Sequence, residues 1–112
     1  MINKTDLLRT SQLEFQFYEH VAQAGLPLPE WQYLVCDHRA DFAWPDLHVC
    51  VEIQGATHRQ GRHTRGAGYA ADRMLANRRQ VDGWIALEFT SDHLNSNAAL
   101  PVLRAALERR GL

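Results

Sequence analysis

The stretch Asp41-Phe-Ala-Trp-Pro-Asp-Leu-His-Val-Cys-Val-Glu-Ile-Gln54 decides the fold of this 112-residue chain. It predicts two strands joined by a tight turn at residues 45–48, because proline presets a turn dihedral and aspartate hydrogen-bonds its own backbone. In the second strand, β-branched residues alternate with more polar ones. Since alternate residues of a strand face opposite sides, Glu52 and Gln54 share one face of the predicted sheet.

The turn also predicts how the two strands pair. If residues 45–48 form the loop, Trp44 pairs with Val49 and Asp41 falls opposite Glu52. Cross-strand neighbours have Cβ atoms roughly 5 Å apart, so two carboxylates would meet on the sheet. Like charges at that distance are unfavourable unless a cation lies between them, and Mg²⁺ favours carboxylate oxygens. The pair therefore predicts a divalent metal site.

The remaining segments predict one α/β domain over residues 1–112, with a mixed four-stranded sheet flanked by helices. Strand 48–54 is the most β-branched segment and is expected to be central. Strand 84–89 follows a helix, so it can lie parallel to a neighbour. The predicted elements are helix 11–24, strands 31–36, 40–44 and 48–54, a long loop over 55–68, helix 67–80, strand 84–89 and helix 96–110.

Two helices carry further expectations. In helix 11–24, Ser11 and Glu14 have the spacing of a capping box, in which glutamate bonds the backbone at the helix start. In helix 67–80 the apolar residues, Met74 and Val81 among them, are placed on one side and Arg79 elsewhere.

Asp41 followed by Glu52-x-Gln54 resembles the motif of the PD-(D/E)xK nuclease superfamily. A wider pattern is similar to small phage and bacterial endonuclease domains related to very-short-patch-repair endonucleases and Holliday-junction resolvases. The resemblance covers residues 11–90 and implies a restriction-endonuclease-like core of order αβββαβα. It is carried by Arg39-Ala-Asp-Phe-Ala-Trp-Pro-Asp, Val51-Glu-Ile-Gln-Gly, Gly61-Arg-His-Thr-Arg-Gly and Gly83-Trp.

The resemblance implies metal-dependent hydrolysis of DNA phosphodiester bonds. Asp41, Glu52 and the Ile53 carbonyl would hold Mg²⁺ or Mn²⁺, and Glu14 would lie near the metal as a further catalytic residue, an alternative to its capping role. The family usually has a lysine where Gln54 stands, and glutamine carries no charge. The alternative is therefore a nuclease-like module that binds DNA with weak or no cleavage.

The segment after the carboxylates is basic. Residues 56–80 contain six arginines and one acid. Guanidinium groups match phosphates bidentately, so we expect this segment to contact the DNA backbone. The expected DNA-binding residues are His58, Arg59, Arg62, His63, Arg65, Arg73 and Asn77.

His58 and His63 leave a third interpretation open, a nuclease centred on histidine. The only two cysteines, Cys36 and Cys50, lack the spacing of a zinc site. So short a chain has little surface to enclose a duplex, which favours a homodimer or a partner subunit. No segment suggests export or a membrane helix, so we expect a cytoplasmic protein. A role in DNA repair, recombination or a phage is implied by the resemblance alone.

Overall fold

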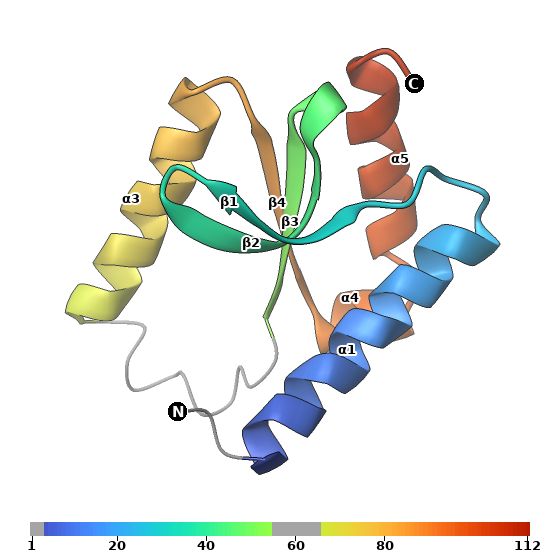
Figure 1. Ribbon diagram of the computed structural model, residues 1–112, viewed down its shortest axis with the longest axis horizontal. Helices are drawn as coiled ribbons and strands as arrows, with labels where there is room; N and C mark the ends of the chain where they lie inside the picture. The colour runs from blue at the N-terminus through green and yellow to red at the C-terminus, as the bar shows by residue number, and fades with distance from the viewer. Residues whose placement is uncertain (1–3, 55–65) are drawn as a thin grey trace.

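The computed structural model describes residues 4–54 and 66–112, with side chains from residue 12 onward. It confirms the α/β class, with a mixed four-stranded sheet of order β1-β2-β3-β4 between helices (Figure 1). Among the described helices, none combines the length and apolar character needed to cross a membrane. The elements are α1 (Lys4–Gln23), β1 (Glu30–Val35), β2 (His38–Trp44), the 3-10 turn η1 (Pro45–Leu47), β3 (Val49–Gln54), α3 (Ala67–Val81), β4 (Ile85–Thr90), α4 (Ser91–Asn95) and α5 (Ala99–Arg109).

The β2–β3 hairpin has the predicted register. Trp44 pairs with Val49, and the antiparallel ladder runs on to the pair Phe42–Val51. The turn closes through η1, after which His48 adopts a left-handed backbone with φ of 54°. As predicted, β3 lies inside the sheet and β4 pairs with it in parallel.

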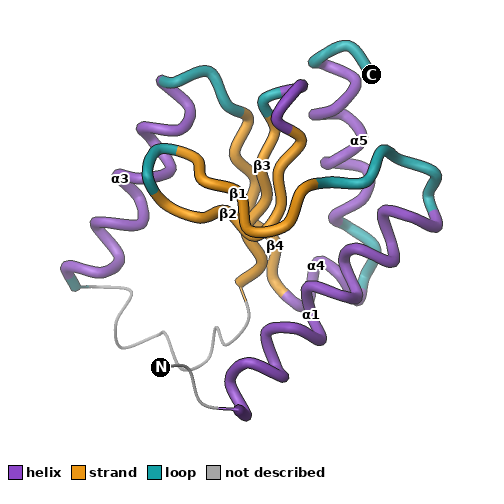
Figure 2. The backbone as a smooth tube through the Cα atoms, in the orientation of Figure 1, coloured by secondary structure: helices purple, strands orange, loops and turns teal. Residues whose placement is uncertain are grey.

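The main core lies on one face of the sheet. Figure 2 shows α1, α4 and α5 together on this side, with α3 alone on the other. Phe17 and Val21 of α1 are fully buried. They pack in one cluster with Phe42 of β2 and with leucines of α5, such as Leu103.

The orientation predicted for α3 is wrong. Met74 is 57% exposed and Val81 is 90% exposed, whereas Arg79 is only 2% exposed and faces the sheet. The sheet under α3 presents small side chains such as Cys50, together with the acid Glu52. A long arginine stem fills the space above small residues, and its head group meets the carboxylate.

Two local expectations are corrected, and one short helix is added. Helix α1 already begins at Lys4, so Ser11 lies inside it and no capping box starts there. The β1–β2 turn consists of Cys36 and Asp37, both with left-handed backbones, so that residues 38 and 39 belong to β2. The predicted helix 96–110 is found as α5, and Thr90 caps an additional short helix, α4, that precedes the predicted one.

Candidate functional site

Asp41 lies where the β2–β3 ladder ends. The last pair is Phe42–Val51, so Asp41 and Glu52 are the next residues on their strands, as the predicted register requires. The N–H of Ile53 donates to Asp41 Oδ2 at 2.7 Å. Burial raises the pKa of Asp41, and the hydrogen bond from Ile53 opposes that rise. Beyond the last backbone pair, the Asp41 side chain therefore takes the place of a backbone acceptor for β3.

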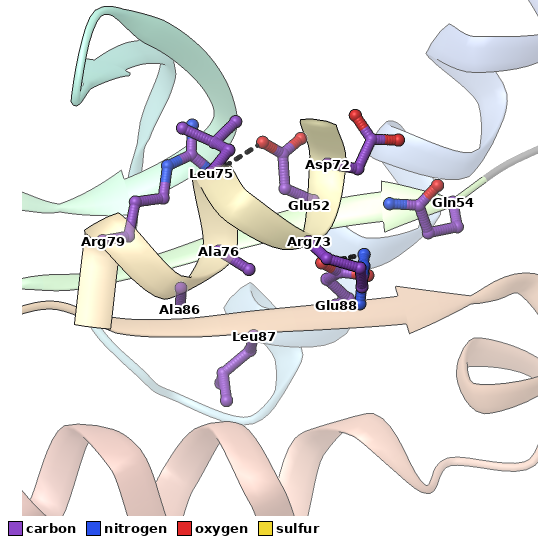
Figure 3. Close-up of a pocket in the computed structure, with 10 residues that line it drawn as sticks. All are labelled: Glu52, Gln54, Asp72, Arg73, Leu75, Ala76, Arg79, Ala86, Leu87 and Glu88. Carbon is purple, nitrogen blue, oxygen red and sulfur yellow. Dashed lines mark hydrogen bonds and ion pairs between the residues drawn. The ribbon is translucent and has the colours of Figure 1, made fainter. Parts of the chain in front are cut away.

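Glu52 is partly buried and bonded to Arg79. The guanidinium Nη1 lies 2.8 Å from Glu52 Oε2 (Figure 3). Burial raises the pKa of Glu52, the hydrogen bond from Arg79 lowers it, and the charge of Asp41 raises it further. Arg79 also donates to the carbonyls of Val35 and His38, at 3.2 and 3.1 Å. One arginine of α3 therefore holds Glu52 and both sides of the β1–β2 turn.

Glu14 reaches the same place from α1. Its side chain is buried, with 6% exposed. Burial raises its pKa to about 7, and the charges of Asp41 and Glu52 contribute to that rise. The structure thus brings the three predicted acidic residues within electrostatic reach of one another, from α1, β2 and β3. Glu14 does not cap the start of α1, and it lies near the other two acids.

Sequence reasoning missed Gln32. Its Nε2 donates to Asp41 Oδ1 at 3.5 Å, and its side chain also hydrogen-bonds Glu14, which lowers the pKa of that acid. Nothing in the pattern of β1 marks Gln32, because an amide between aromatic residues looks like an ordinary strand position. Only the tertiary structure places it between two carboxylates.

A pocket of about 120 Å³ opens beside Glu52, between α3 and strands β3 and β4 (Figure 3). Gln54 lines it with Glu52, so the two share a face as predicted. Glu88 of β4 lies next to Glu52 in the parallel register. Arg73, which is expected to bind DNA, contacts both oxygens of Glu88, at 3.1 and 2.9 Å, and Glu88 raises its pKa. Glu88 is a further acid that the sequence did not single out.

The other expected DNA-binding residues are not brought to this pocket. Asn77 lines a different pocket, with Cys36 and Met74. The remaining five, His58, Arg59, Arg62, His63 and Arg65, lie outside the described residues.

The described side chains contain no group of three or more His, Cys, Asp or Glu already arranged to hold a metal ion. Their chemistry nevertheless fits a hard cation, because Glu14, Asp41 and Glu52 offer carboxylate oxygens, the ligands that such ions favour. An ion would compete with Arg79 for Glu52 and with the Ile53 N–H for Asp41. The N–H and C=O of a strand residue lie on the same edge, so the Ile53 carbonyl is on the side of Asp41.

Comparisons of the chain with protein-family models, with curated proteins and with solved structures gave no match.

Proposed function

We propose that this protein is a metal-dependent endodeoxyribonuclease with a restriction-endonuclease-like core. The observation that carries the proposal is the convergence of Glu14, Asp41 and Glu52. Burial raises the pKa of each, and the charge of Asp41 adds to the rise at Glu14 and Glu52. The element order also supports it, because a helix, three antiparallel strands, a helix and a parallel strand follow one another as that core requires.

Mg²⁺ or Mn²⁺ is the proposed cofactor. Asp41, Glu52 and the Ile53 carbonyl would hold it, with Glu14 nearby. When bound, such an ion lowers the pKa of a coordinated water and neutralises charge on the phosphate oxygens. Without a cation, folding buries three acids whose charges repel one another, and a divalent ion would offset that repulsion.

The chain's own residues suggest how a proton is handled. Glu14, with a pKa of about 7, can accept a proton from water near neutral pH, which is the range in which a general base is most effective. Gln54, on the face of Glu52, can orient a water through its amide but cannot take up the proton. The arginines at positions 59, 62 and 65 are proposed to contact DNA phosphates.

A second candidate function rests on Arg79. Its guanidinium already neutralises Glu52, and Gln54 supplies no positive charge to the pocket. Both features suit a nuclease-like module that binds DNA with weak or no cleavage. Such a module would retain the DNA-binding surface and lose the metal requirement.

Cleavage assays separate the two functions. Supercoiled, linear, single-stranded and branched DNA would be incubated with Mg²⁺, Mn²⁺ or EDTA. The wild type would be compared with Glu52→Ala and with Glu108→Gln, a control that removes an exposed acid of α5. The nuclease predicts metal-dependent cutting that is lost only in Glu52→Ala. DNA binding without cutting would favour the inactive module, and cutting that survives Glu52→Ala would refute the proposed mechanism.

The preferred substrate would bear on the proposed role in repair, recombination or a phage. Sedimentation of the protein with and without duplex DNA would show whether a second copy joins the complex. A complex with one protein molecule per cleavable duplex would argue against the homodimer.

A further inference from the structure

Gln32 has an unusual backbone for a strand residue. Its φ is 53°, in the left-handed region. The β1–β2 ladder contains the pairs Trp31–Phe42 and Tyr33–Ala40, but not the intervening pair of Gln32 with Asp41. A residue other than glycine is strained in this backbone conformation. Asparagine and aspartate adopt it more readily than glutamine does. Such strain persists only where the surroundings hold it in place.

The neighbours of Gln32 hold the strained conformation. Arg39 Nη1 donates to the Gln32 carbonyl at 3.2 Å. The ring of Trp31 lies 4.7 Å from that of Phe42, in the main core, whereas the ring of Tyr33 lies 6.3 Å from that of Trp84. Phe42 belongs to the cluster under α1, and Trp84 packs against the cluster under α3. Residues two apart in a regular strand share a face, so the break at Gln32 sends the two rings to opposite faces.

The same break aims the Gln32 amide at the carboxylates. Its Nε2 reaches Asp41 Oδ1 at 3.5 Å, and its side chain hydrogen-bonds the buried Glu14. An amide nitrogen carries two N–H donors, so one side chain can serve both acids. Gln32 thereby links an acid of α1 to an acid of β2 across the edge strand.

We propose that Gln32 is a positioning residue of the carboxylate site, and that its strained backbone persists because it directs the amide to Glu14 and Asp41. The inference rests on the proposed nuclease function. Gln32 acts through the two carboxylates and need not touch substrate. Groups that orient metal ligands in this way affect metal affinity or activity about 10- to 100-fold when they are removed.

Two substitutions distinguish the effect of removing the amide from the effect of relieving the backbone strain. Gln32→Met removes the amide and keeps a long side chain in the strained backbone. Gln32→Gly removes the amide and relieves the strain, because glycine adopts left-handed φ freely. We expect both variants to lose about tenfold in Mn²⁺ affinity, measured by calorimetry, and in metal-dependent cleavage. Gln32→Gly should at the same time raise the Tm in EDTA by about 3 °C over that of Gln32→Met.

The matched control is Asn97→Gly. Asn97 also has a left-handed backbone, with φ of 61°, in the loop between α4 and α5. It lies outside the elements that carry Glu14 and Asp41, so metal affinity and cleavage should stay at wild-type values. If Gln32 had only a structural role, Gln32→Gly would not be more stable and at the same time bind metal more weakly.

The outcomes are distinguishable. Wild-type Mn²⁺ affinity and cleavage in Gln32→Gly or Gln32→Met would overturn the role of Gln32 and leave the nuclease intact. A wild-type protein that neither binds Mn²⁺ nor cleaves DNA would overturn the proposed function, and the positioning role with it. A Tm for Gln32→Gly no higher than that for Gln32→Met would overturn the claim that the backbone is strained for this purpose.

Discussion

Glu14 is the acid whose ionisation the fold opposes most clearly, since burial and nearby acids raise its pKa from 4.5 to about 7. The folded protein keeps this proton at pH values where the unfolded chain has lost it, so this group reduces stability as pH rises from 4.5 to 7. In EDTA we expect Glu14→Gln to raise the free energy of unfolding by up to about 3 kcal/mol at pH 8 and to leave it unchanged at pH 4. Urea denaturation at both pH values measures this, and an equal effect at both would contradict it.

Arg79 is the second residue with a measurable energetic role. Arg79→Met leaves Glu52 without its partner and removes the donor to the Val35 and His38 carbonyls. Breaking a buried ion pair on one side costs about 3–5 kcal/mol. The double variant Arg79→Met, Glu52→Gln should recover part of this loss.

The matched control is Arg73→Gln, because the Arg73–Glu88 pair is more exposed. Its removal should cost under about 1 kcal/mol. Equal losses in Arg79→Met and Arg73→Gln, measured by chemical denaturation, would show that burial of the Arg79 pair has no special energetic effect.

At the scale of elements, the β2–β3 hairpin could be predicted because its signals are local. Alternation fixes the faces of a strand, and the turn at residues 45–48 fixes the register that opposes Asp41 and Glu52. Glu14 and Arg79 could not be placed in this way. The contacts of both depend on how helices distant in sequence lie against the sheet.

Helix α3 shows why periodicity was insufficient. Half of its apolar residues are alanines, whose burial gains little, so the apolar pattern does not determine which side faces the sheet. The acid Glu52 beneath the helix requires a partner, and the Arg79 side turns inward instead. Gln32 was missed for a related reason. A left-handed φ inside a strand does not change the alternation of polar and apolar residues in the sequence.

The orientation of α3 has a direct test. Val81→Lys adds a charge to a side chain that is already 90% exposed, so it should change the free energy of unfolding by less than about 0.5 kcal/mol. Leu103→Ala, in the fully buried core of α5, should cost about 3 kcal/mol. A large loss of stability in Val81→Lys would mean that the side of α3 predicted from the sequence is the one that faces the sheet.

For the whole molecule, a bound cation should appear as added stability. If Mn²⁺ binds the folded protein alone, a concentration 100 times its Kd adds about 2.7 kcal/mol and raises the Tm. We expect EDTA to reverse the gain and Glu52→Gln to abolish most of it. A Tm that is independent of Mn²⁺ at millimolar concentrations would contradict the metal site.

The acids and their neutralising arginine come from different halves of the chain. Glu14, Gln32, Asp41 and Glu52 all belong to elements that end by Gln54, whereas Arg79 lies on α3, which leads into β4. On the ribosome, the helix and the three antiparallel strands therefore leave the exit tunnel before the guanidinium that neutralises Glu52 does. The order of emergence delays this charge compensation, so a nascent chain stalled with β3 outside the tunnel and Arg79 still inside it should compact more readily in mild acid than at neutral pH.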